Sequence, residues 1–250
     1  MLASPWAGQA PPLPPTARAV VVASEVDTKA ERLYIPGPAG QLEALLEFDA
    51  AWRVRATAVV CHPHPLFGGT MHNKVVYRAA KAALEAGLPT LRFNFRGAGK
   101  SEGQFADGIG EREDVRGALD FLQARYPQVP VCLMGFSFGA VVGVSVGAHD
   151  PRVAALAGLG VPVTISSFDF LREAHKPVLL VQGTEDIYGR RPQVEALFST
   201  LPEPKRLHWV KGADHFFTGK LEEVQTVVRA FVEEMLTQIS PPPDSPWPGR

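Results

Sequence analysis

The chain alternates between two patterns of apolar positions. Short continuous apolar runs are typical of strands buried on both faces of a sheet, and longer stretches with apolar residues every three to four positions are typical of amphipathic helices. The runs predict strands over residues 57–61, 90–95, 130–134, 153–163, 176–183 and 206–210. The longer stretches predict helices over residues 75–86, 109–126, 140–148 and 221–236. This order predicts an α/β fold with a mostly parallel central sheet and helices on both faces.

Two short strands precede this alternation. Residues 31–35 and 42–48 are separated by Pro36-Gly37-Pro38-Ala39-Gly40, which predicts an opening hairpin. Prolines gather at both ends of the chain. Residues 1–16 also lack the basic residue and the apolar run of a signal peptide. We therefore expect a Pro-rich N-terminal arm over residues 1–27, a folded domain over residues 28–240 and a Pro-rich C-terminal tail over residues 241–250.

Composition and charge narrow the class of protein. The 250 residues are 46% apolar and carry a formal net charge of −1 without a basic cluster, which argues against binding to nucleic acid or to anionic membranes. No apolar stretch reaches the ~18 residues that span a bilayer, so we expect no membrane insertion. Cys61 and Cys132 lie in predicted interior strands, which favours buried thiols in a reducing compartment and a cytoplasmic protein. The sequence leaves the oligomeric state open.

A serine lies at the junction of a predicted strand and a predicted helix. Gly135-Phe136-Ser137-Phe138-Gly139 follows the apolar run 130–134 and precedes the small-residue helix 140–148. A serine on such a sharp turn has strained dihedral angles, and the two glycines prevent collisions between strand and helix. The N–H of Phe138 then lies beside the serine oxygen, where negative charge develops in acyl transfer. The pattern predicts that Ser137 is a nucleophile.

Because the same five residues also fit a glycine-rich turn with an idle serine, the prediction depends on the partners of Ser137. A serine needs a histidine base, and the imidazole needs an acid that fixes its tautomer. Asp186 follows the strand 176–183, and His215 follows the strand 206–210. All three residues come just after the carboxyl end of a strand, where open α/β sheets bind ligands. We predict that Ser137, Asp186 and His215 form a catalytic triad.

Other roles for the two partners stay open at this point. Asp186 could cap a helix that begins near Arg191, and His215 could be a histidine of a surface loop. Glu185 and Asp214 are rival acids. Asp214 is too close in sequence to face His215 easily, whereas Glu185 remains a minor alternative to Asp186.

The loop after the first parallel strand is the expected source of a second oxyanion donor. Pro63 and Pro65 have no backbone N–H, so the donor must come from His64, Leu66 or a later residue. We expect an oxyanion hole formed by the N–H of Phe138 together with that of His64, or, as the second choice, that of Leu66.

The histidines of this loop also suggest a metal site. His62, His64 and His72 could share zinc, but no Asp, Glu or Cys of suitable spacing accompanies them. Imidazoles that bind neighbouring backbone explain the pattern better. We therefore expect no metal and no cofactor.

A glycine-rich segment at residues 94–101 resembles a phosphate-binding loop at its end. Asn94 stands where that motif requires its first glycine, and Glu102 stands where a dinucleotide-binding motif requires its third. The segment is better explained as a glycine-rich turn near the rim of the active site.

Four separated motifs carry a family resemblance. They are His-Pro-His-Pro-x-x-Gly-Gly-Thr-Met at residues 62–71, Arg-Phe-Asn-Phe-Arg-Gly at 92–97, Gly-x-Ser-Phe-Gly at 135–139 and Gly-Ala-Asp-His-Phe-Phe at 212–217. With these motifs the chain resembles the α/β-hydrolase superfamily over roughly residues 29–239. More narrowly, it is similar to small bacterial serine hydrolases that are distantly related to dienelactone hydrolases.

The resemblance implies that residues 28–240 form an α/β-hydrolase domain with a Ser-Asp-His triad at Ser137, Asp186 and His215 and no cofactor. It does not imply a substrate, because the fold hosts many reactions. Dienelactone hydrolases carry cysteine where this chain has Ser137. This departure argues against dienelactone hydrolase activity.

The connection that often carries a lid in related enzymes is short here. Only residues 164–175 separate the strand 153–163 from the next one, so we expect no cap domain and an open site rimmed by loops. Aromatic side chains near the motifs are candidates for an acyl pocket, although such residues more often only pack a sheet edge. They are Phe67, Phe136, Phe138 and Phe216.

The sequence therefore predicts a capless, carboxylesterase-like serine hydrolase. We expect it to cleave small-molecule carboxylic esters with small or medium acyl groups through an acyl-enzyme on Ser137. The same triad would serve an amide or peptide hydrolase or an acyltransferase, and an inactivated hydrolase fold would serve as a binding scaffold. The pattern does not separate these alternatives.

Overall fold

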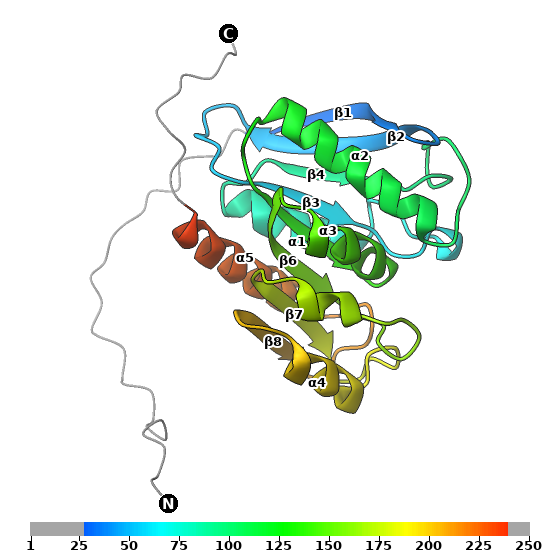
Figure 1. The fold of residues 1–250 in the computed structure, drawn as a ribbon, viewed down its shortest axis with the longest axis vertical. Coiled ribbons are helices and arrows are strands. Elements are labelled where there is room, and N and C mark those ends of the chain that lie inside the picture. Colours follow the sequence, from blue (N-terminus) through cyan, green and yellow to red (C-terminus); the bar gives the residue numbers. More distant parts are fainter. Residues whose placement is uncertain (1–27, 240–250) are drawn as a thin grey trace, which may run out of the picture.

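One eight-stranded sheet organises the protein, as the computed structural model shows for residues 28–239 (Figure 1). The spatial order is β1-β2-β4-β3-β5-β6-β7-β8. Strands β3 to β8 run parallel to their neighbours, whereas the β1–β2 hairpin joins β4 in antiparallel fashion. The strands are β1 (Thr28–Gly37), β2 (Gly40–Asp49), β3 (Thr57–Cys61), β4 (Thr90–Phe93), β5 (Val131–Phe136), β6 (Val153–Leu159), β7 (Val178–Gly183) and β8 (Lys205–Val210).

Helices cover both faces of this sheet. In Figure 1, α2 and α3 lie in front of the sheet, and α1 and α5 lie behind it. The helical elements are η1 (Pro65–Phe67), α1 (Lys74–Glu85), α2 (Ile109–Arg125), η2 (Ala140–Val144), α3 (Ser145–His149), η3 (Asp169–Glu173), α4 (Arg191–Thr200) and α5 (Leu221–Gln238). The predicted fold class is thereby confirmed, including the opening hairpin. The predicted arm over residues 1–27 and tail over residues 241–250 lie outside the described residues, and the domain limits stay predictions.

The central strands are buried on both faces because each separates two hydrophobic cores. In β3, Val59 and Cys61 belong to the core under α2, α3 and α4, whereas Ala58 and Val60 belong to the core under α1 and α5. The continuous apolar runs of the sequence reflect this double burial.

Two predicted strands are too long, and the reason is local chain geometry. β4 ends at Phe93 instead of residue 95 because the Phe95 N–H donates to Nε2 of His62 and not to a neighbouring strand. β6 ends at Leu159 instead of residue 163 because Gly160 has a φ of 54°, which turns the chain out of the sheet. Both breaks lie at the carboxyl edge of the sheet.

The connection between β6 and β7 contains only the short helix η3. Within residues 28–239 there is no cap domain over the carboxyl edge of the sheet, as the length of this connection predicts. None of the helices in the same residues has both the length and the apolar character needed to cross a bilayer.

Candidate active site

Ser137 sits on a strained turn between β5 and the helical turn η2. Its φ is 54°, a left-handed conformation that side chains other than glycine seldom adopt. The flanking glycines are sterically required: a Cβ on Gly135 would lie 2.2 Å from the Gly139 oxygen, and one on Gly139 would lie 2.3 Å from the Cys61 oxygen. The turn therefore holds the serine at the end of β5 as the motif predicts.

Three predicted site residues form one hydrogen-bonded chain. Nε2 of His215 lies 3.0 Å from Oγ of Ser137, and Nδ1 of His215 lies 2.7 Å from Oδ2 of Asp186. Asp186 and His215 are buried, at 3% and 8% exposure. Such an arrangement can pass the hydroxyl proton to the imidazole while the carboxylate holds the ring in one tautomer.

The carboxylate that contacts His215 is that of Asp186, not that of Glu185 or Asp214. Glu185 is exposed and interacts with Oγ1 of Thr184. Asp214 accepts hydrogen bonds from the backbone and hydroxyl of Thr218 and from the N–H of Phe216, which lower the pKa of its carboxyl. Both rival acids thus have other partners.

Two backbone N–H groups beside Ser137 are available to a ligand. Within residues 28–239, the N–H groups of Phe138 and His64 donate no hydrogen bond to protein, and both residues line the cleft that contains Ser137. The N–H of Leu66 instead donates to Nδ1 of His64 at 3.3 Å. Of the two loop donors considered from the sequence, His64 is therefore the one that is unoccupied.

An aromatic cluster holds the loop of His64 against the turn of Ser137. The His64 ring centroid lies 4.7 Å from that of Phe138 and 4.8 Å from those of Phe67 and Phe105. Burial lowers the pKa of His64, while Glu111 and Asp107 act in the opposite direction. The ring contacts keep His64 in place, and its burial disfavours the protonated form.

His62 serves the backbone and not a metal. Nε2 of this fully buried ring accepts the N–H of Phe95 at 2.9 Å, so Nδ1 carries the proton and donates to the Pro63 oxygen at 2.6 Å. Burial lowers the pKa of His62 to about 4, although the bond to Pro63 opposes this shift. Both ring nitrogens are therefore occupied, and His62 has none left for zinc.

An open cleft of about 230 Å³ surrounds Ser137. Its side-chain lining is largely apolar and includes no Asp, Glu, Lys or Arg. Phe67, Phe138 and Phe216 line the cleft as predicted, whereas Phe136 is fully buried and does not. Val141, Ile165 and Tyr188 also line the cleft, and sequence patterns could not predict them because they come from separate loops and a helix.

The glycine-rich turn after β4 binds the Glu43 carboxylate of β2 and is not a phosphate site. Oε2 of Glu43 accepts the backbone N–H of Lys100 at 2.8 Å and Nδ2 of Asn94 at 2.7 Å. Ser101 completes the turn, since its hydroxyl donates to the Asn94 oxygen and accepts the Glu43 N–H. The turn is thus tied to β2, as expected of a structural turn.

The two cysteines are free and fully buried, and burial raises the pKa of both thiols. Neither side chain lines the cleft around Ser137. Their burial in the sheet agrees with a structural role.

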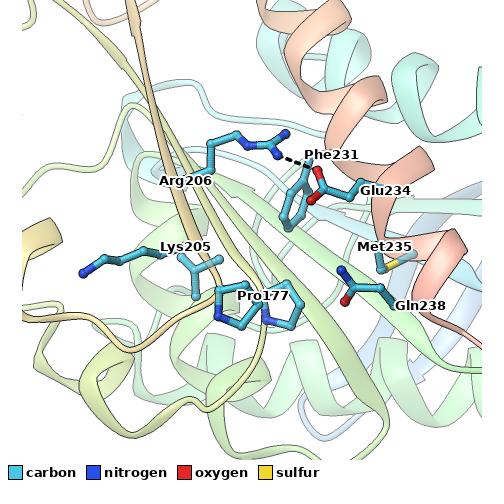
Figure 2. Close-up of a pocket in the computed structure, with 9 residues that line it drawn as sticks. Pro177, Lys205, Arg206, Phe231, Glu234, Met235 and Gln238 are labelled. Carbon is cyan, nitrogen blue, oxygen red and sulfur yellow. Dashed lines mark hydrogen bonds and ion pairs between the residues drawn. The ribbon is translucent and has the colours of Figure 1, made fainter. Parts of the chain in front are cut away.

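A second, much smaller groove lies at the opposite ends of the strands. It has a volume of about 50 Å³ and lies between the first residues of β7 and β8 and the last turns of α5 (Figure 2). Arg206 and Glu234, which form an ion pair, both line it. Because Ser137 lies at the carboxyl ends of the strands, this groove is separate from the candidate active site.

The sheet order, the strained serine turn and the site at the carboxyl edge are those of an α/β hydrolase. The chain belongs to the family described as alpha/beta hydrolase domain, whose sequence profile matches residues 56–240. The resemblance stated from the four motifs is thereby confirmed, and membership supports a hydrolase activity.

Solved structures agree with this class. An α/β serine hydrolase homologue from Coxiella burnetii is 40% identical, with a TM-score of 0.75 over 80% of this chain and 96% of its own. An α/β serine hydrolase without lid from Xanthomonas campestris is 32% identical, with a TM-score of 0.75 over 82% of this chain and 94% of its own. In sequence, an uncharacterised protein of Rickettsia prowazekii is also similar, with 36% identity over 80% of this chain and 88% of its own length.

Proposed function

We propose that this protein is a carboxylesterase-like serine hydrolase that cleaves small-molecule esters through an acyl-enzyme on Ser137. The observation that carries the proposal is the hydrogen-bonded chain Ser137–His215–Asp186, in which Ser137 and His215 line an open, largely apolar cleft. Two unoccupied N–H groups beside the serine, those of Phe138 and His64, support it.

The proposed reaction has two half-reactions. Oγ of Ser137 attacks the ester carbonyl while Nε2 of His215 takes the hydroxyl proton, and the N–H groups of Phe138 and His64 bind the oxyanion. His215 then gives this proton to the leaving alkoxide, and the acyl group stays on Ser137. In the second half-reaction His215 takes a proton from water, which attacks the acyl-enzyme, and the proton returns to Ser137 as the carboxylic acid leaves. Asp186 fixes the tautomer of His215 throughout.

The cleft supports uncharged esters with small or medium acyl groups. Its volume of about 230 Å³ is modest, and no charged side chain lines it to bind a carboxylate or phosphate of a substrate. The same triad would cleave amides or transfer acyl groups, but no contact in the cleft favours these reactions. We propose the ester reaction and a cytoplasmic location, the latter because both cysteines are free and buried.

The test is covalent labelling of the full chain by a fluorophosphonate, read by intact mass. This reagent requires an activated serine beside oxyanion donors. We expect one adduct on the native protein and none on Ser137→Ala. Ser166→Ala is the matched control, because Ser166 lines the same cleft, and it should label like the native protein.

Turnover of 4-nitrophenyl acetate, butyrate and octanoate, compared with the matching anilides, then separates ester from amide hydrolysis. Absence of labelling and turnover in a folded native protein would contradict the proposal and favour a scaffold on the hydrolase fold. Labelling that persists in Ser137→Ala would contradict the assignment of the nucleophile.

A further inference from the structure

Gln182 is a buried amide near the carboxyl end of β7. It belongs to β7, where the four preceding residues, 178–181, are all apolar, and its side chain is fully buried. Burying an amide side chain costs free energy unless both of its ends are hydrogen-bonded. We therefore expect hydrogen-bond partners for both the oxygen and the nitrogen of the Gln182 amide.

Both ends of this amide have a partner, and the partners fix its orientation. Oε1 accepts the N–H of Val161 at 2.8 Å, and Nε2 donates to Oδ2 of Asp186 at 2.6 Å. A backbone N–H can only donate and an ionised carboxylate can only accept, so the reverse orientation of the amide would break both bonds. Gln182 thus connects the loop after β6 to Asp186.

The bond from Nε2 of Gln182 is one of four hydrogen bonds to the Asp186 carboxylate. Oδ2 is shared by Gln182 and by Nδ1 of His215 at 2.7 Å, while Oδ1 accepts the N–H groups of Tyr188 at 2.8 Å and Gly189 at 3.3 Å. With donors on both oxygens, the carboxylate cannot rotate about its Cβ–Cγ bond without losing several of them. Without Gln182, only His215 would hold Oδ2.

We propose that Gln182 is a positioning residue of the hydrolase, which holds Oδ2 of Asp186 against His215. Its N–H group also binds the negative charge on Oδ2, so less of that charge acts on the imidazole. The inference rests on the proposed function, because it assigns Gln182 a role in the reaction of Ser137. Sharing of Oδ2 weakens the attraction of the carboxylate for a protonated His215. Gln182 therefore favours the neutral imidazole that acts as the base.

Few other ionisable groups face His215 in the described part of the chain. The ring of Tyr188 lies 4.8 Å from the imidazole centroid, and the neighbouring Asp214 is held by Thr218 and Phe216. Phe136 and Phe216 pack against the remaining sides of the ring. A change at Gln182 thus acts on His215 mainly through Asp186.

Two variants of near-equal size separate this role from packing. Gln182→Met keeps the length and removes the donor, and Gln182→Glu replaces the donor by a second carboxyl group. We expect Gln182→Met to lower kcat/KM about 10- to 100-fold, the effect of losing one hydrogen bond to a charged group. The acidic limb of its pH–rate profile should move to higher pH. Gln182→Glu should move it less, because two buried carboxyl groups at this distance share one proton, which keeps a donor on Oδ2 of Asp186. Gln193→Met, on the exposed side of α4, is the control and should match the native protein.

The readout is the rate of fluorophosphonate labelling against pH, with unfolding monitored in parallel. Loss of stability with an unchanged pH profile would overturn the inference and leave the proposed function intact. If Gln182→Met does not fold, Gln182→Asn serves instead, because its shorter amide cannot reach both Val161 and Asp186.

A native protein that does not label would contradict the proposed function, and the role of Gln182 would then be tested separately. The NMR signal of the hydrogen-bonded Nδ1 proton of His215 reports the contact with Asp186 directly. We expect this signal to shift or broaden in Gln182→Met, and an unchanged signal would overturn the inference.

Discussion

Nδ1 of His62 donates to the carbonyl oxygen of Pro63 across 2.6 Å, inside a completely buried site. That carbonyl shares one planar peptide group with the N–H of His64. In a trans peptide the C=O and N–H point in opposite directions, so a bond that fixes the first also fixes the second. His62 thereby sets the direction of the N–H that we propose as an oxyanion donor.

Replacing His62 tests this relationship. His62→Phe keeps a ring of similar size but removes the bond to Pro63, so the N–H of His64 loses its fixed direction. We expect kcat to fall by about 10²-fold with little change in KM, because an oxyanion donor acts mainly in the transition state. Steady-state kinetics with 4-nitrophenyl butyrate measure both. A rise in KM at constant kcat would contradict this role.

His62 also predicts a pH dependence of stability. In the unfolded chain it titrates near its usual pKa of 6.5, whereas in the folded protein burial lowers the pKa to about 4. Between these values the unfolded state binds the proton and the folded state does not, so the free energy of unfolding falls as the pH drops from 6.5 to 4. The loss from this group is on the order of 3 kcal/mol.

Urea unfolding at several pH values measures this loss. The difference in stability between the native protein and His62→Gln should narrow as the pH drops through this window, because the variant lacks the titrating group. A constant difference from pH 7 to pH 4 would show that another group carries the effect.

Asp186→Asn tests the tautomer of His215. The amide is the same size as the carboxylate but can present its N–H₂ group to Nδ1, which favours the wrong tautomer for accepting the proton of Ser137. We expect kcat to fall by about 10⁴-fold with the fold intact. Glu185→Gln is the control, since Glu185 does not contact His215, and its kcat should stay within about twofold of the native value.

Two isoleucines with equal exposure test the binding of the acyl group. Ile165 and Ile109 are both 71% exposed, but only Ile165 lines the cleft. Ile165→Ala should lower kcat/KM for the octanoate ester about 3- to 10-fold relative to the acetate, because it removes apolar surface from the longer chain. Ile109→Ala should leave this ratio unchanged. Equal ratios in both variants would place the acyl chain elsewhere.

A buried ion pair anchors the turn after β4. Arg96 donates to both oxygens of Asp114, which is completely buried, with its shortest contact at 2.6 Å. Asp114→Ala should lower the free energy of unfolding by about 3–5 kcal/mol, because it leaves the Arg96 charge unpaired. The exposed pair Arg116–Glu113 is the control, and Glu113→Ala should change stability by no more than about 1 kcal/mol. Equal losses in urea unfolding would contradict the distinction.

Much of the fold follows from local patterns in the sequence. The apolar runs predict the parallel strands because these strands are buried on both faces. The serine motif predicts its own turn because a Cβ on Gly135 or Gly139 would lie 2.2 or 2.3 Å from a backbone oxygen. The positions of Ser137, Asp186 and His215 along the chain are also informative. Each follows a strand, and parallel strands end at one edge of the sheet.

Sequence patterns did not predict where β4 and β6 end, nor the contacts by which Gln182 and His62 support the site. Phe95 and Val161 lie in the predicted strands but outside the sheet, and their N–H groups donate to side chains that are distant in sequence, those of His62 and Gln182. An amide within the apolar strand β7 was the one available signal for Gln182, and it does not reveal which partner the amide binds.

The sequence by itself therefore determined the order of strands and helices, the turn of Ser137 and the candidate triad, because these depend on periodicity and on steric rules between neighbours. Only the tertiary structure decided which acid faces His215, which loop N–H is free and how Gln182 and His62 support the site. The contacts of His215 with Asp186 and of His62 with Phe95 join residues that are 29 and 33 positions apart, and they depend on how the loops pack at the edge of the sheet. No local pattern in the chain encodes that packing.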